Sequence, residues 1–96
     1  MAGPWKVASP TALSWRSWAG EIVVYDDGSG DTHYLEPLAA EVFERLLEAP
    51  ADLDELGDRV ARSLAVDRDD RLGEAIDAAV DKLRVCGLIA QRAPRR

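Results

Sequence analysis

The stretch Leu13-Ser-Trp-Arg-Ser-Trp-Ala-Gly-Glu-Ile-Val-Val-Tyr-Asp26 decides the fold of this chain. Both of its halves are rich in the aromatic and β-branched residues that favour a pleated strand. Ala19-Gly20 between them is a two-residue turn signal, and glycine readily adopts the positive φ that such a turn needs. The stretch therefore predicts a β-hairpin, with Trp15 on one face of its first strand and Trp18 on the other.

The residues that follow extend this pattern and then change it. A second turn, Asp27-Gly-Ser-Gly30, leads into Asp31-Thr-His-Tyr-Leu35, in which Thr and Tyr favour a third strand. After Pro37 the apolar residues recur with the period of a helix, and proline at a first helical position has its φ already set. Strands followed by helices are typical of an α+β domain.

Three helices are predicted after the strands. The first begins at Pro37, and the second begins after Asp52, whose side chain is suited to a capping box with the Glu three residues on. The third begins around Asp69 or Asp70 and ends before Gly87, the expected left-handed residue. The buried stripe expected for the second helix is Leu53, Leu56, Val60 and Leu64. The predicted fold class is α+β, with a three-stranded antiparallel sheet followed by three helices (βββααα).

The chain forms one domain with short extensions. Residues 1–12 carry proline and glycine without a period, which predicts an irregular lead-in, and residues 13–91 form the domain. Leu88-Ile-Ala90 is short and apolar, so it either adds a strand or packs under the helices. Residues 92–96 are expected to form a basic tail.

Length and composition limit what the chain does. With 96 residues it is too short for both a cofactor-binding unit and a substrate-binding unit, so we expect neither an enzyme nor a cofactor. The single cysteine, Cys86, excludes an intrachain disulfide and suits a reducing compartment. No apolar run reaches the ~18 residues of a membrane span, and the N-terminus lacks the features of a signal peptide. The expected location is the cytoplasm, with no membrane partner.

Negative charge is concentrated in the middle of the chain. The chain has 12 Lys and Arg against 18 Asp and Glu, for a net charge of −6. Between Glu21 and Asp58 twelve carboxylates face a single cation, Arg45. Such a segment repels the phosphates of nucleic acid. It attracts cationic partners, whose association is expected to slow as salt rises. Solvated helix faces account for the same pattern without any partner.

Groups that carry out catalysis are scarce. His33 is the only histidine, so a site with two histidine ligands is excluded and we expect no metal. Asp31 and His33 share one strand face, an arrangement that suits an oriented general base. Because the sequence fixes no Ser or Cys nucleophile nearby, a surface or partner-facing histidine beside a turn is favoured instead. Cys86 falls in the last turn of the third helix, where a buried and inert thiol is favoured over a reactive one. We therefore predict no catalytic residues.

Three tryptophans fall within the first 18 residues, which is more than a small core requires. We expect Trp15 to lie in the core. Trp5 and Trp18 either cover the sheet or lie at an interface with another protein, where aromatic residues are enriched. A homodimer through the Trp-rich strands is one such interface.

Four strings carry a resemblance to a known family. They are Trp15-Arg-Ser-Trp18, Gly20-Glu-Ile-Val-Val-Tyr25, Ser29-Gly-Asp-Thr-His-Tyr-Leu35 and Pro37-Leu-Ala-Ala40. In this order they resemble the PqqD-like proteins, and most of all the small branch found with an HPr kinase-related protein, the HPr-rel-A system PqqD family peptide chaperones. The similarity covers about Trp5 to Ala90. One departure is Glu36, where a small N-cap residue is expected.

The resemblance implies a winged-helix-like peptide-recognition domain, or RiPP recognition element, which captures the leader segment of a precursor peptide and presents it to a modifying enzyme. An outer strand has unpaired backbone groups, so the peptide is expected to join the sheet as a fourth strand. By analogy it lies between the third strand and the third helix. The expected peptide-binding or partner-binding residues are Asp31, Thr32, His33, Tyr34, Leu35, Asp77 and Arg84. On the helix, Gly73, Asp77 and Arg84 flank one side of the buried stripe and Ala75 and Lys82 the other, and either flank is compatible with the pattern.

Two other functions stay open. A winged-helix DNA-binding regulator needs a basic recognition helix, whereas the third helix sets Arg71, Lys82 and Arg84 against five carboxylates. A structural subunit that completes an enzyme without binding peptide fits the same pattern. The leading prediction is a non-catalytic chaperone that binds a leader peptide or a partner segment by strand addition and delivers it to an HPr kinase-related enzyme.

Overall fold

The computed structural model describes residues 4–91 of the chain. Its elements, in chain order, are β1 (Trp5–Val7), the 3-10 helix η1 (Pro10–Ala12), β2 (Leu13–Trp18), β3 (Glu21–Asp26), β4 (Thr32–Leu35), α1 (Pro37–Glu48), α2 (Leu53–Leu64), α3 (Asp70–Val85) and β5 (Ile89–Gln91). Strands β2, β3 and β4 form an antiparallel sheet in that order, and β1 pairs with β5. The predicted three-stranded sheet followed by three helices is confirmed. The expected basic tail, residues 92–96, lies outside the described residues.

The turn between β2 and β3 sets the register of the sheet. Ala19 and Gly20 both adopt positive φ, at 51° and 80°, as a type I′ turn requires. Trp18 therefore pairs with Glu21, and every second residue of β3 points to the same face. Ile22 and Val24 share the face that turns toward the helices, and they are 1% and 0% exposed. The predicted hairpin and its turn are confirmed.

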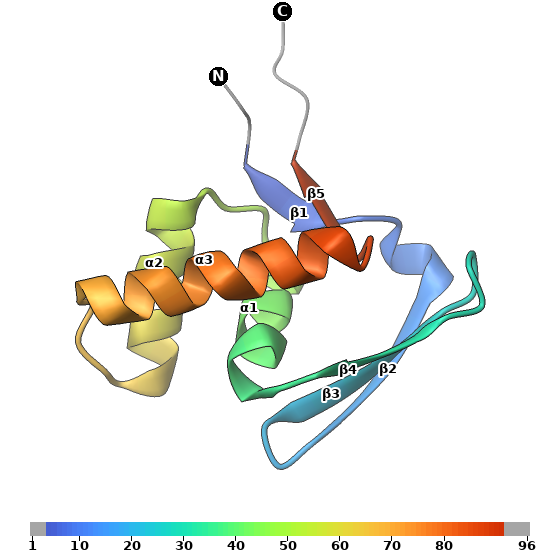
Figure 1. Cartoon of the computed structure of the whole chain (residues 1–96), viewed down its shortest axis with the longest axis horizontal. Helices are drawn as coiled ribbons and strands as arrows, with labels where there is room; N and C mark the ends of the chain where they lie inside the picture. The colour runs from blue at the N-terminus through green and yellow to red at the C-terminus, as the bar shows by residue number, and fades with distance from the viewer. Residues whose placement is uncertain (1–3, 92–96) are drawn as a thin grey trace, which may run out of the picture.

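The three helices lie on one face of this sheet (Figure 1). Helix α1 contacts β3 and β4 on one side and α2 and α3 on the other. The core side chains at these contacts are Ile22, Val24, Leu35, Val42, Phe43 and Leu83. Full burial of such a side chain stabilises the fold by roughly 1.5–3 kcal/mol. Helix α1 is therefore the element that ties the sheet to α3.

Each helix begins where its capping residues predict. Pro37 is the first residue of α1. The carboxylate of Asp52 accepts a hydrogen bond from the backbone N–H three residues on (2.8 Å) at the start of α2, and Asp69 does the same for α3 (2.8 Å). Glu36 precedes α1 and forms no side-chain cap. Helix α1 thus starts with its first backbone N–H groups uncapped by a side chain.

The expected irregular lead-in is wrong for residues 5–7 and 10–12. Residues 5–7 form β1, which pairs with β5 in an antiparallel register that sets Trp5 opposite Gln91, and residues 10–12 form η1. A three-residue strand is too short to show a period, and its partner lies at the other end of the sequence. Of the two alternatives for Leu88-Ile-Ala90, a strand is the one observed, because β5 begins at Ile89.

Three apolar side chains are more exposed than the sequence predicts. Leu53 and Leu64 are 43% and 44% exposed because they stand at the two ends of α2, whereas Leu56 in its middle is fully buried. Trp15 faces the core and meets Phe43 edge-on with ring centroids 5.8 Å apart, yet it is 41% exposed because β2 is an outer strand. The expected core position of Trp15 is therefore only half realised.

None of the helices within residues 4–91 has both the length and the apolar character needed to cross a bilayer.

Candidate functional site

The outer edge of β4 has free backbone groups. In the part of the chain that the structure describes, β4 pairs with β3 and with no other strand. The backbone N–H of Asp26 donates to the carbonyl of Asp31 (2.9 Å). Since hydrogen-bonded pairs alternate along an antiparallel ladder, His33 and Leu35 also bond to β3. Thr32 and Tyr34 therefore direct their N–H and C=O groups outward, where an added strand binds.

The β4 side chains alternate between the helix side and the outer face of the sheet. Leu35 points toward the helices and is fully buried. His33 points to the same side and is partly buried, and its Nε2 is buried with no hydrogen-bond partner among the described residues. Thr32 and Tyr34 point to the outer face and are exposed. Asp31 precedes β4 rather than opening it.

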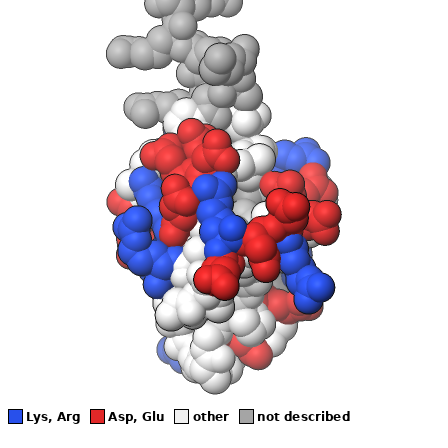
Figure 2. All heavy atoms as spheres, turned by 90° about the vertical axis from the view of Figure 1, so that its left-hand side faces the viewer, with Lys and Arg blue, Asp and Glu red and all other residues white. Residues whose placement is uncertain are grey.

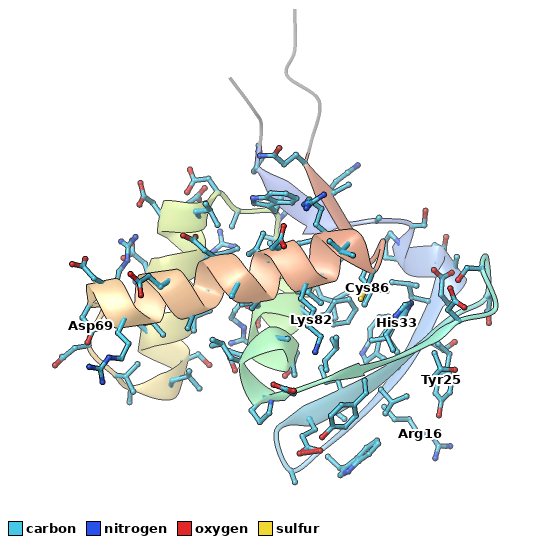
Figure 3. All side chains as sticks on the ribbon, viewed as in Figure 1. Arg16, Tyr25, His33, Asp69, Lys82 and Cys86 are labelled. Carbon is cyan, nitrogen blue, oxygen red and sulfur yellow. The ribbon has the colours of Figure 1, made fainter. Side chains whose placement is uncertain are left out.

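Lys82 marks the flank of α3 that is turned toward β4. Its side chain extends from α3 in the direction of β4 (Figure 3), and within residues 4–91 it takes part in no ion pair. Ala75 lies two turns earlier on the same flank. Ala79 lies between them and is 8% exposed. Between Ala75 and Lys82 this flank therefore presents small side chains, with the Lys82 cation after them.

Asp77 and Arg84 lie on the other flank of α3. They are seven residues apart and line a hollow of about 150 Å³ together with Trp5 and Leu53. Lys82, five residues after Asp77, is rotated by about 140° around the helix. The structure therefore gathers residues 31–35 and Lys82 on one side of the molecule, and Asp77 and Arg84 on another. Arg84 also pairs with the neighbouring Asp81 (2.6 Å).

Cys86 lies at the end of α3, on the side where His33 lies (Figure 3). It is a free thiol and partly buried, rather than fully buried as the sequence predicts. Cys86 is only partly buried because it follows the last turn of α3, where it is the C-cap residue. Among the residues that the structure describes, no three His, Cys, Asp or Glu side chains gather as metal ligands.

The outer face of the sheet is aromatic and lacks a covering element among the described residues. Trp18, Tyr25 and Tyr34 are 51%, 44% and 50% exposed there. The hydroxyl of Tyr34 donates to the carboxylate of Glu21. This hydrogen bond is the main reason that the pKa of Tyr34 is raised, and desolvation and the negative charges of Glu21 and Glu36 raise it further. For Trp18, the open position agrees with either of its two expected roles.

A cluster of charges joins α2 to the segment before α3. Arg68 pairs with Asp54 (3.0 Å) and Asp58 (2.8 Å), and the hydrogen bond to Asp54 is the main reason that its pKa is raised. Acidic and basic side chains alternate over this end of the molecule (Figure 2). The guanidinium of Arg68 lies over Gly57, and a Cβ added at residue 57 would approach Arg68 Nε to 2.6 Å. Sequence reasoning missed this cluster, because the loop that carries Arg68 has no regular pattern.

The comparisons with known proteins agree with this arrangement. Residues 21–89 match the family described as Coenzyme PQQ synthesis protein D (PqqD). The fold is similar to that of the structure "TbiB1 in Complex with the TbiA(beta) Leader Peptide", with a TM-score of 0.71 and 18% sequence identity over 93% of this chain and 99% of that chain. No curated protein matches the chain. Because the matched residues make up most of the sequence, the chain belongs to the PqqD family.

Proposed function

We propose that this chain is a non-catalytic peptide-recognition domain, a RiPP recognition element, which binds the leader segment of a precursor peptide as a fourth strand at the β4 edge. The observation that carries the proposal is the outward direction of the Thr32 and Tyr34 backbone groups on an unpaired edge. An extended peptide gains its affinity from main-chain hydrogen bonds at such an edge and its specificity from the alternate side chains.

Two comparisons support the peptide partner. Membership of the PqqD family covers the strands β3 and β4 and all three helices. The similar structure of TbiB1 contains a leader peptide. The expected site residues Asp31, Thr32, His33, Tyr34 and Leu35 belong to the proposed β4 site. In place of Asp77 and Arg84 we propose Lys82 as the helix residue of this site, because it is on the flank turned toward β4.

The chain is proposed to present the bound peptide to a modifying enzyme, which the sequence resemblance suggests is HPr kinase-related. The aromatic outer face is proposed as the surface that meets a protein partner, either this enzyme or a second copy of the chain. Exposed Trp and Tyr side chains are the usual anchors of such interfaces. The single cysteine suits the cytoplasm as the place where this happens.

Two matched proline variants test the strand addition. A phage-displayed library of random peptides is selected on the wild-type chain, and the affinity of an enriched peptide is measured by calorimetry. Thr32→Pro removes an N–H from the outer edge of β4. Ser17→Pro removes an N–H from the outer edge of β2, since the same alternation leaves residue 17 unpaired on that side. We expect Thr32→Pro to weaken binding at least about tenfold, and Ser17→Pro to leave it unchanged.

Each result has a clear meaning. Equal affinity of the two variants, with the fold intact by circular dichroism, would contradict strand addition at β4. Weaker binding by Ser17→Pro alone would move the site to the β2 edge. A library that yields no enriched peptide would contradict peptide recognition itself.

A further inference from the structure

Three arginines line a hollow between α1 and α2. The hollow has a volume of about 220 Å³, and its lining residues are Arg45 and Glu48 of α1 and Arg59, Arg62 and Ser63 of α2. One carboxylate in the lining thus stands against three guanidinium groups. The volume is smaller than the roughly 300–1,000 Å³ that is usual for drug-sized ligands. The hollow therefore suits a small ion or a single functional group of a larger molecule.

Much of the hydrogen-bonding capacity of these arginines is unused, although a guanidinium carries five N–H donors. Among residues 4–91, Arg45 donates a hydrogen bond to the hydroxyl of Ser63 (3.2 Å), and its Nε is buried without a hydrogen-bond partner. Arg59 donates to the carbonyl of Ala49 (3.1 Å). The side chain of Arg62 takes part in no ion pair or hydrogen bond in the described part of the chain. The lining therefore keeps donors for a further acceptor.

The carboxylates beside these arginines are held loosely. Three of them lie farther from the guanidinium nitrogens than the 2.7–3.2 Å of a hydrogen bond: Glu41 and Glu48 at 3.4 and 3.5 Å from Arg45, and Glu55 at 3.7 Å from Arg59. The other ion pairs of the described chain measure 2.6–3.0 Å. The side chains of Glu48 and Glu55 are 61% and 53% exposed, so both can turn to solvent. A better-fitting anion can therefore displace them.

The number of donors decides the kind of anion. One arginine satisfies a planar carboxylate with two parallel hydrogen bonds, which would leave the other two guanidinium groups unused. A phosphoryl group has three acceptor oxygens and a charge of about −1.5 to −2 at pH 7. These oxygens accept from guanidinium groups that come from two helices and from the hydroxyl of Ser63. We propose that this hollow binds a phosphoryl group, either as free phosphate or as the ester of another molecule.

The phosphoryl site goes beyond the peptide recognition proposed above, because none of its lining residues belongs to β4 or α3. Arg45 is the single cation between Glu21 and Asp58. Its place beside Arg59 and Arg62 collects positive charge at one point of an otherwise acidic stretch. Electrostatic attraction of an anion is therefore confined to this hollow within that stretch.

A titration with inorganic phosphate at constant ionic strength tests the site. The backbone amide signals of the protein are followed by nuclear magnetic resonance while phosphate replaces chloride, and we expect saturable shifts at residues 45 and 59–63. Arg62→Gln should weaken phosphate binding about tenfold, because a charge-assisted hydrogen bond is lost. Arg16→Gln is the matched control. It removes an arginine of β2 that is also exposed and without an ion pair in residues 4–91, and it should change the affinity less than about twofold.

A variant of opposite sign separates binding from damage to the fold. Glu48→Gln removes the carboxylate of the lining and should strengthen phosphate binding about two- to threefold. Glu44→Gln removes a carboxylate of α1 that is outside the lining, and it should have a smaller effect. Circular dichroism confirms that each variant is folded.

A short phosphoserine peptide and its unphosphorylated form identify the source of the phosphoryl group. Tighter binding of the phosphopeptide than of free phosphate would support the site with a phosphorylated chain as its ligand. Equal binding would support it with free phosphate as the ligand. The absence of saturable shifts at tens of millimolar phosphate would overturn the proposal, and so would equal effects of Arg62→Gln and Arg16→Gln.

Discussion

The hydroxyl of Tyr34 on β4 donates a hydrogen bond to the carboxylate of Glu21 on β3, across the outer face of the sheet. Glu21 lies two residues along β3 from Val23, the pairing partner of Tyr34, so the bond runs diagonally. It draws the aromatic side chain over β3. The free edge of β4 is thereby left open beside a tyrosine that is held in place.

Removal of this bond should shift the titration of Tyr34. The pKa of Tyr34 is raised chiefly by the hydrogen bond to Glu21, so Glu21→Ala is expected to lower it toward about 10. The measurement is the absorbance of tyrosinate against pH in a Tyr25→Phe background, which leaves one tyrosine. Glu36→Gln is the control and should have a smaller effect. Since the folded pKa is the higher one, the bond stabilises the fold below about pH 10 and loses this effect as pH rises through the folded pKa.

Gly57 and Arg68 should be energetically coupled. Alanine in place of glycine favours a helix by roughly 0.5–1 kcal/mol, but at residue 57 its Cβ would displace the Arg68 guanidinium from Asp54 and Asp58. We therefore expect Gly57→Ala to stabilise the chain more in an Arg68→Ala background than in the wild type. The difference between the two effects should be about 0.5–1 kcal/mol. Urea unfolding of the four variants measures this coupling. Equal effects in both backgrounds would show that the guanidinium moves aside freely.

A better cap should stabilise α1. Glu36 occupies the N-cap position without a side-chain hydrogen bond, and serine there accepts one from the first turn. Glu36→Ser is expected to raise the free energy of unfolding by about 0.5–1 kcal/mol. Glu44→Ser, in the middle of the same helix, is the control and should lower it slightly. No gain at residue 36 would mean that the start of α1 is satisfied in another way.

Replacement of His33 by an apolar residue should stabilise the fold. Its Nε2 is buried without a hydrogen-bond partner among the described residues, and a buried unpaired polar atom costs about 1–3 kcal/mol. His33→Leu is therefore expected to raise the free energy of unfolding by about 1 kcal/mol, measured by urea unfolding. Thr32→Val, on the exposed side of the same strand, should have little effect. A loss of stability in His33→Leu would indicate that the imidazole is satisfied after all.

The aromatic outer face gives a prediction about self-association. If a second copy covers it, the molecular mass from light scattering should rise with concentration, and Trp18→Ser should abolish the rise because an exposed aromatic anchor is lost. Val85→Ser removes a comparably exposed side chain from α3 and should leave the rise intact. A mass equal to one chain at every concentration would contradict self-association through the outer face.

The elements that the sequence predicts well are those with a local cause. Ala19-Gly20 required positive φ at both residues and both adopt it. Asp52 and Asp69 cap the helices that follow them. A turn or a cap involves neighbouring residues, so its physics is contained in a short string.

The parts that the sequence did not reveal depend on contacts between distant residues. Strand β1 forms because residues 5–7 pair with residues 89–91 and the backbone of Trp5 bonds to that of Ala51. No local sequence pattern predicts these pairings. The sequence could not show which flank of α3 is turned toward β4, because this depends on how α3 and β4 are arranged in space.

The pairing of β1 with β5 also has a consequence for how the chain is assembled and used. It pairs residue 5 with residue 91, so the two ends of the described chain lie side by side. The loop between these paired residues contains almost the whole sequence. Closing so long a loop costs more conformational entropy than forming the local hairpin and helices. The start of β1 and the end of β5 lie on the side of α3 opposite β4 (Figure 1). A second protein fused at either end would therefore leave the β4 edge open, and a short link between the ends should allow circular permutation.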